Sequence, residues 1–380
     1  MKNPLAILQG ILSSVFLACS LSPHRWERFS QFMVSLSILA FLPLQVPQIW
    51  RNFDAITSQD PATIAHLKVI PVLGYVSGMV ANLLLMCYLA DRQERWGAIV
   101  QCLGIVTSGI VVTQLFSVGL VDPLLFAVLI LGVGLGISLN GIQLWRGTDQ
   151  PLSTSAPELT PEPCPDPGTF DRLWALWKNG LNILGLTLFP LILTWQLQES
   201  LLPHLSLGCG VVGSCLLLGI SSTALLENQF PSTWSEHPWW SPLEQLLGLF
   251  RRYWAVLSGW TANLLFMFGP AAQLMANLVH PESIAALALP TQFLSAFGNL
   301  LILTRSGTLF IQGHDRVWAV GSFWEVTVRG LVFLTIAYYG FMDWAWFEGY
   351  SLGVCLYGVW IYQNARTSRT VTAEVQNILI

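Results

Sequence analysis

Residues 123–145 read PLLFAVLILGVGLGISLNGIQLW and contain no charged side chain. A helix needs about 20 apolar residues to cross about 30 Å of hydrocarbon, and this stretch is long enough. Similar apolar blocks recur on both sides of it, and over the whole chain 53% of residues are hydrophobic while 10% are charged. Soluble domains carry about 25% charged residues. The sequence therefore predicts an all-α polytopic membrane protein whose main partner is the lipid bilayer.

The apolar blocks on either side of this stretch predict about ten transmembrane helices in all. We expect them at residues 31–50, 69–90, 97–118, 123–145, 173–196, 205–226, 253–277, 283–304, 317–339 and 344–363. Two connections are longer than the others. Residues 146–171 are rich in proline and acidic residues, which is typical of a flexible linker. Residues 227–252 contain a tryptophan pair and an apolar face, which predict an interfacial helix.

These elements divide the chain into six predicted segments. The first is an apolar N-terminal segment, whose residues 5–21 fit a signal-like stretch, an interfacial anchor or a further span. The segments are 1–30, a first helix-bundle repeat at 31–145, the linker at 146–171, two connecting helices with the interfacial segment at 172–252, a second helix-bundle repeat at 253–363, and a C-terminal tail at 364–380.

The basic residues support an even number of spans after residue 31. Of the 17 Lys and Arg residues, only Arg51 and Lys68 fall on the side opposite to the N-terminal flank of the first span. The flank side holds Arg25, Arg28, Arg92, Arg95, Arg146, Arg172, Lys178, Arg251, Arg252, Arg305, Arg316, Arg366 and Arg369. Positively charged loops stay cytoplasmic, so we expect a cytoplasmic C-terminus. The net charge of -4 and the lack of a basic cluster argue against nucleic-acid binding.

Two stretches of the chain share an unusual pattern. Gln48 is followed four residues later by Asn52, just after Pro47, and a second Gln-x-x-x-Asn begins at Gln273, just after Pro270. Each pattern is followed by a proline-bearing span that contains Asn-Leu-Leu, at residues 82–84 and 299–301. Six crossings separate the two patterns, so both point the same way. We therefore predict two parallel repeats, a known transporter plan.

The prolines and amides of this repeat suit a carrier of a neutral solute. Pro47 and Pro270 either act as matched hinges or reflect the general frequency of proline in membrane helices. An amide offers donors and an acceptor at a lower desolvation cost than an ion. The amides either line a polar cavity or bond a neighbouring helix. The candidate solute-binding residues are Asn82, Asn299, Asn263, Gln48, Gln273 and Trp260, whose indole face can stack on a sugar ring.

Glu325 and Arg329 are the clear charges inside a predicted span. They are four residues apart on one helix, so they can pair on one face. Two interpretations remain open: a proton site, or a structural pair that neutralises itself.

The chain lacks the common signatures of enzymes and metal sites. The six histidines and seven cysteines are dispersed without metal-ligand spacing, and no CxxC occurs. HExxH, GxSxG and the P-loop are absent as well. We therefore expect no metal, no cofactor and no enzymatic activity.

Two stretches carry a family resemblance. Pro47-Gln48 within residues 42–49, echoed in degenerate form in the second half, resembles the PQ-loop superfamily, which includes the SWEET sugar carriers. The run 258–270, SGWTANLLFMFGP, is similar to the maltose excess family of plastid maltose transporters. The resemblance implies facilitated export of maltose or a glucose-type sugar. It also implies that one asparagine in each half contacts the sugar, and Asn82 and Asn299 suit that role by position.

The sequence thus predicts a sugar carrier that works by alternating access of two half-bundles, with maltose or a related neutral sugar as its solute. A proton-coupled carrier of another small solute, such as an amino acid, is the first alternative. A non-transporting membrane receptor or assembly protein is the second. Because the first span begins too early for a plastid-style transit peptide, we expect a bacterial, cyanobacterial-type inner or plasma membrane. The direction of transport and the oligomeric state stay open.

Overall fold

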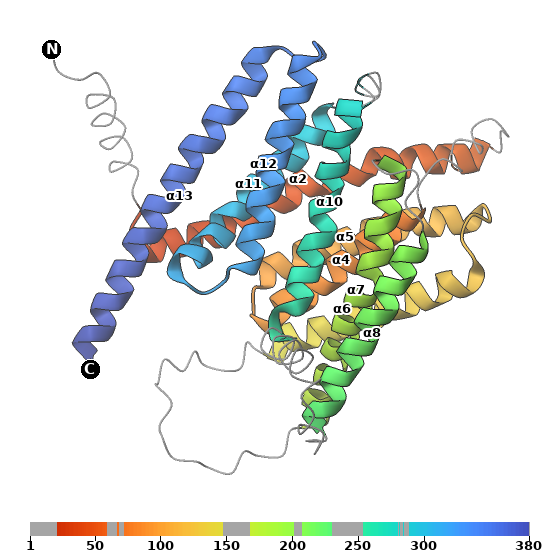
Figure 1. Cartoon of the computed structure of the whole chain (residues 1–380). Coiled ribbons are helices and arrows are strands. Elements are labelled where there is room, and N and C mark those ends of the chain that lie inside the picture. The colour runs from red at the N-terminus through yellow and green to blue at the C-terminus, as the bar shows by residue number, and fades with distance from the viewer. Residues whose placement is uncertain are drawn as a thin grey trace, which may run out of the picture. The chain divides into compact units, whose positions relative to one another are not determined.

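The computed structural model describes most of the chain as helices (Figure 1). It describes residues 21–58, Leu67, 72–146, 168–200, 207–229, 254–279, Pro281, Ile284 and 289–379. Within these ranges every regular element is helical, which confirms the predicted all-α class. The N-terminal residues 1–20, most of the predicted linker and the tryptophan pair of the predicted interfacial helix lie outside the described residues.

The described helices follow one another through short connections or undescribed segments. They are α2 (Pro23–Ser58), α4 (Val72–Asp91), α5 (Arg95–Ser117), α6 (Pro123–Arg146), α7 (Thr169–Ser200), α8 (Leu207–Gln229), the short 3-10 helix η3 (Trp254–Val256), α10 (Leu257–Val279), α11 (Leu289–Gln312), α12 (Val317–Tyr338) and α13 (Trp344–Leu379).

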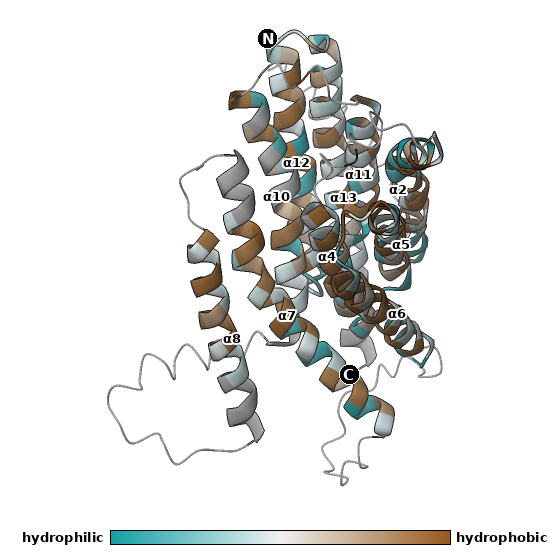
Figure 2. Cartoon of the chain, turned by 90° about the vertical axis from the view of Figure 1, so that its right-hand side faces the viewer, coloured by the Kyte–Doolittle hydropathy of each residue, from teal (hydrophilic) through white to brown (hydrophobic). Residues whose placement is uncertain are grey.

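Seven of the described helices are long and apolar enough to cross a membrane. They are α2, α4, α5, α6, α7, α11 and α12, and α8 adds a shorter apolar stretch at Leu207–Ser222. Figure 2 shows hydrophobic residues over most of α4 and α6. Each of the ten predicted spans overlaps a described helix, but the structure supports seven by length and composition. The remaining crossings stay a prediction.

Several helices extend beyond their predicted bounds, α2 and α13 by the greatest length. The sequence predicts that the first span begins at residue 31, but helix α2 begins at Pro23, and Trp26 in its first turns is fully buried. This turn therefore belongs to a packed core and not to a separate N-terminal segment. At the other end of the chain, α13 continues to Leu379, through most of the predicted tail. Asn364 and Ala365 in this extension are buried, which explains why the helix continues.

The chain forms two compact units that are not its two sequence halves. Unit 1 comprises Met1–Leu44 and Gln273–Ile380, and unit 2 comprises Gln45–Ala272. The predicted repeats at 31–145 and 253–363 group the helices differently. Both unit boundaries lie inside helices, one in α2 beside Pro43 and Pro47 and the other in α10 just after Pro270. A proline inside a helix removes a backbone hydrogen bond, so these are the places where each helix can bend most easily.

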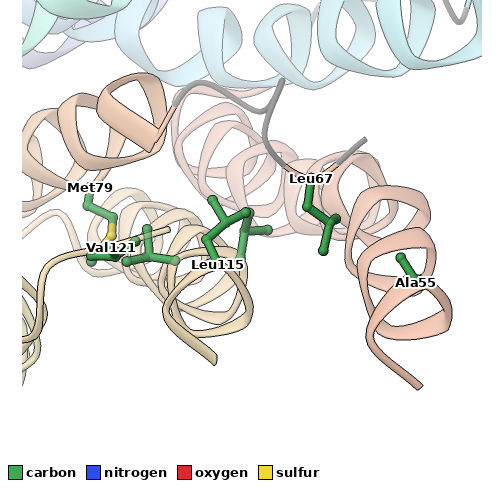
Figure 3. Close-up of a cluster of buried hydrophobic side chains, with 7 residues drawn as sticks. Ala55, Leu67, Met79, Leu115 and Val121 are labelled. Carbon is green, nitrogen blue, oxygen red and sulfur yellow. The ribbon is translucent and has the colours of Figure 1, made fainter. Parts of the chain in front are cut away.

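Each unit has its own apolar core. In unit 2, side chains from α2, α4 and α5 meet around the α5–α6 turn (Figure 3). They are Ala55, Leu67, Met79, Val111, Val112, Leu115 and Val121. In unit 1, a second cluster is centred on α11 and α12 and consists of Ile284, Ala296, Val332, Phe333 and Ile336.

The two cores use corresponding positions of two helices. Helix α5 contributes Val111, Val112 and Leu115, and α12 contributes residues 332, 333 and 336 with the same spacing. Partly buried Phe126 of α6 and Phe347 of α13 then follow at matching distances along the chain. The third and fourth helices of each predicted repeat therefore bury the same faces.

The turns after α5 and α12 match as well. Gly119 and Gly340 adopt φ angles of 76° and 79°, a left-handed conformation that ends a helix and that glycine adopts without strain. Three residues later, an aspartate begins the next helix in each case. Asp122 Oδ1 accepts a hydrogen bond from the backbone N–H of Leu124, and Asp343 Oδ1 accepts one from the N–H of the residue two positions on, both at 2.9 Å. Such N-terminal caps satisfy otherwise unpaired helix donors.

Candidate functional site

The Gln-x-x-x-Asn pattern of α2 forms a hydrogen-bonded chain in unit 2. Gln48 Nε2 donates to Asn52 Oδ1 at 2.7 Å, and Asn52 Nδ2 donates to Gln114 Oε1 of α5 at 3.0 Å. Gln114 Nε2 in turn donates to the carbonyl oxygen of Ile49 at 2.9 Å. Asn52 is fully buried, so its bonds lie away from water. We call this chain, with the related one below, an amide clamp, because it ties the first helix of a predicted repeat to the third.

The pattern of α10 forms the second amide clamp, in unit 1. Gln273 Nε2 donates to Asn277 Oδ1 at 2.8 Å, and Asn277 Nδ2 donates to Thr335 Oγ1 of α12 at 2.9 Å. Asn277 is fully buried, as its counterpart in α2 is. Gln48 and Gln273, which we predicted as solute ligands, therefore use a side-chain N–H within the protein. The sequence pattern identified the asparagines, but the partners on α5 and α12 carry no such signal in the sequence.

Asn82 and Asn299 each donate a hydrogen bond to the backbone of their own helix. Asn82 Nδ2 donates to the carbonyl oxygen of Gly78 at 2.7 Å, and Asn299 Nδ2 donates to that of Ser295 at 3.0 Å. Both side chains are partly buried. In the described part of the chain, neither Oδ1 atom has a hydrogen-bond partner. Each amide therefore keeps an acceptor and one N–H for another molecule. Asn82 lies in unit 2 and Asn299 in unit 1.

The two candidates on α10 differ from each other. Trp260 is partly buried, so part of its indole surface is accessible. Asn263 is only 2% exposed, which places its amide among protein groups. Between them, Thr261 packs closely on α7, since a Cβ on Gly185 would lie 3.0 Å from Thr261 Cγ2. Of the two, Trp260 is the better placed to contact a solute.

Glu325 and Arg329 form an ion pair within α12, as their spacing predicted. Arg329 Nε lies 3.2 Å from Glu325 Oε2, and the side chains are 17% and 13% exposed, respectively. Arg329 Nη1 also donates to Gln292 Oε1 of α11 at 2.8 Å. The arginine thus contacts both a carboxylate and an amide, although Glu325 Oε2 and Arg329 Nε make no hydrogen bond among the described residues. The proton site and the structural pair both stay predictions.

A second ion pair, whose arginine is buried, was not predicted from the sequence. Arg305, which we counted with the loop charges, lies inside α11 and pairs with Glu27 of α2. Trp26 Nε1 donates to Thr308 Oγ1 at 3.1 Å beside this pair, and the indole packs edge-on against the ring of Trp360. These contacts fix the first turns of α2 to α11 and α13 in unit 1. The pairing was hidden because the two charges lie far apart in the sequence.

These contacts define a helical membrane protein with polar, uncharged groups held inside its apolar helices. No group of three or more His, Cys, Asp or Glu side chains suited to a metal ion occurs among the described residues. The sequence model of a family described as "Maltose excess protein 1 N-terminal domain" matches residues 21–147. This match and those below support the predicted resemblance to the maltose excess family.

Two curated relatives extend the likeness over most of the chain. "Maltose excess protein 1, chloroplastic" of Arabidopsis thaliana is 27% identical over 307 residues, which cover 81% of this chain and 63% of the relative. "Maltose excess protein 1-like, chloroplastic" of Oryza sativa subsp. japonica is 28% identical over 307 residues, covering 81% and 65%. The chain thus spans less than two thirds of the length of these relatives. No solved structure matches.

The comparisons contradict the predicted localisation. We expected a bacterial inner or plasma membrane with a cytoplasmic C-terminus, but both relatives are chloroplastic proteins of plants. They point to a plastid membrane. The early start of the first span was a poor guide to the compartment.

The amide clamps are expected to stabilise the units in which they lie. Asn277→Ala removes both bonds of the clamp in unit 1 and leaves polar groups unpaired, at a cost of about 1–3 kcal/mol. The midpoint of thermal unfolding of the purified protein should fall accordingly. Thr327→Ala is the matched control on α12, because Thr327 is exposed and bonds only its own helix, at 2.8 Å to Phe323 O. Equal midpoints for the two variants would contradict the role of the clamp.

Proposed function

We propose that the chain is a member of the maltose excess family that carries maltose or a related neutral sugar across a plastid membrane by facilitated diffusion. In this proposal about ten spans form two parallel PQ-loop-type repeats, and the solute passes by alternating access of the two half-bundles. The chain catalyses no reaction and needs no cofactor.

The recurrence of the amide clamp is the observation that carries this proposal. The same Gln–Asn hydrogen bond on the first helix, followed by a bond to the third helix, occurs in each unit. The matching core positions on α5 and α12 and the matching glycine turns support the same duplication. Parallel duplication of a helix bundle is a plan that transporters use.

The choice of solute rests on the chemistry of the available groups. Asn82 and Asn299 each keep an uncharged acceptor and an N–H, which can pair with the hydroxyl groups of a sugar. Trp260 keeps accessible indole surface that can pack on the apolar face of a sugar ring. The names of both relatives refer to maltose, which agrees with this chemistry.

A flux assay with a panel of solutes tests the proposal. The purified full chain is placed in lipid vesicles, and the entry of labelled maltose, glucose, sucrose and neutral amino acids is measured with no ion gradient. We expect maltose or a related sugar to equilibrate across the bilayer, with no entry of the amino acids. Vesicles that admit an amino acid and no sugar would contradict the proposed solute class. Tight sugar binding without flux would favour a receptor instead.

Proton coupling is the second candidate, and the Glu325–Arg329 pair is the observation that bears on it. Because Arg329 is held by both Glu325 and Gln292, we expect the pair to stay closed during transport. Glu325→Gln should therefore keep sugar flux within about twofold of the wild type, and an imposed pH gradient should not drive accumulation. Accumulation that follows the pH gradient and disappears in Glu325→Gln would favour the proton-coupled carrier.

A further inference from the structure

Asn82 lies directly against a glycine of the neighbouring helix. A Cβ added to Gly104 of α5 would lie 2.5 Å from Asn82 Oδ1, 2.8 Å from its Cγ and 2.9 Å from its Nδ2. All three distances are shorter than real Cβ contacts, which essentially never fall below 3.0 Å. The whole carboxamide therefore occupies the space that any side chain at position 104 would need.

A second contact fixes the orientation of this carboxamide. Asn82 Nδ2 donates to the carbonyl oxygen of Gly78 at 2.7 Å, one turn earlier in α4. The hydrogen bond holds one N–H, and the surface of Gly104 limits rotation of the amide plane. A methyl group at position 104 would displace this side-chain end and with it the hydrogen bond to Gly78. Oδ1 and the second N–H then have one preferred direction.

The asparagine of the other unit is supported differently. Neither Gly330 of α12 nor the glycines of α13 have Asn299 among their nearest neighbours. The glycine next to it in sequence, Gly298, instead supports the ring of Phe41, whose Cζ would lie 2.7 Å from a Cβ at that position. The close fit between Asn82 and Gly104 thus differs from the contact at Gly298.

We propose that Gly104 is a positioning residue that sets the orientation in which Asn82 meets a hydroxyl group of the sugar. The proposal rests on the proposed function, in which Asn82 binds the solute. Small residues let membrane helices approach closely, and here the approach brings the amide of one helix onto the backbone of the next. Gly104 itself makes no contact with the sugar and acts through Asn82.

Gly104→Ala tests this role, because alanine is a better helix former than glycine. Any loss of function then comes from the displaced carboxamide and not from a weaker helix. We expect the dissociation constant of labelled maltose, measured on the purified full chain, to rise about three- to tenfold, the equivalent of one lost hydrogen bond. The half-saturation concentration for flux should rise by the same factor, with little change in maximal rate.

Gly109→Ala is the matched control on the same helix. Its Cβ would meet only Met79 Cε, at an ordinary contact distance of 4.0 Å. Affinity in this variant should equal that of the wild type. In the Asn82→Ala background, Gly104→Ala should have no further effect, because a positioning residue has nothing left to position.

Three results would overturn the inference. The first is a change of less than twofold in Gly104→Ala, and the second is an equal loss of affinity with and without Asn82. A wild-type protein that binds no sugar of the panel is the third, and it would remove the proposed function as well. Sugar binding without flux would contradict only the carrier function. The sugar affinities of the variants would still test the role of Gly104.

Discussion

Replacing both asparagines that we propose as solute ligands, in Asn82→Ala/Asn299→Ala, is expected to raise the half-saturation concentration for maltose flux by about 5- to 150-fold. Each amide supplies hydrogen bonds worth about 0.5–1.5 kcal/mol, so that losing both costs about 1–3 kcal/mol. Alanine also removes the bonds to Gly78 O and Ser295 O, but each of these lies within one helix. The measurement is the initial rate of labelled maltose entry into vesicles over a range of concentrations.

Asn140→Ala is the matched control for this double variant. Asn140 of α6 makes the same bond to its own helix, with Nδ2 2.7 Å from the carbonyl oxygen of Gly136. It is fully buried, so no solute can reach it. Its replacement should leave the half-saturation concentration unchanged. If it raises that concentration as far as the double variant does, the bonds within the helices explain the effect and sugar contact does not.

Glu27→Gln is expected to lower the free energy of unfolding more than the loss of an exposed ion pair does. Arg305 is 6% exposed and pairs with Glu27, and its Nη1 lies 3.5 Å from Ser30 Oγ. Because Glu27 is itself 36% exposed, removing its charge weakens a partly screened contact to the buried guanidinium, and we expect a cost of about 1–3 kcal/mol, between that of an exposed and of a fully buried pair. Glutamine has nearly the same shape, so the loss reports the charge. The measurement is the midpoint of thermal unfolding of the purified protein in detergent.

Asp171→Asn provides the same change of charge at an exposed ion pair. Asp171 Oδ1 lies 2.7 Å from Arg146 Nη1, and the two side chains are 49% and 46% exposed. Exposed pairs contribute about 0–1 kcal/mol, so the midpoint should hardly move. A shift as large as that of Glu27→Gln would mean that net charge, and not the burial of Arg305, determines the stability.

The sequence predicted those features that depend on local patterns. Apolar blocks predicted the helices, because the apolar length needed to cross a membrane is visible in the sequence itself. The Gln-x-x-x-Asn pattern marked Gln48 and Asn52 as notable, and the structure joins these two residues directly, although we had predicted Gln48 as a solute ligand. The spacing of Glu325 and Arg329 predicted their ion pair.

The features that the sequence did not predict all depend on contacts between distant segments. Gln114 and Thr335 complete the amide clamps from other helices, and no local pattern indicates which residue of those helices faces Asn52 or Asn277. From the sequence we placed Arg305 just after the end of a span, because a charged side chain is costly in lipid. Its partner, the partly exposed Glu27, lies near the other end of the sequence. The compartment could not be derived from local patterns either.

The interleaved path of the chain has a consequence for biosynthesis. Residues up to Leu44 belong with a unit whose remaining residues begin only at Gln273. As the ribosome makes the chain, Trp26 and Glu27 must therefore wait for α11 and α13 before they are buried. Contacts of such long sequence separation form slowly, and they leave apolar and charged groups unsatisfied in the meantime. A nascent chain that stops before α11 should thus be a ready substrate for membrane quality control, whereas unit 2 can already be complete.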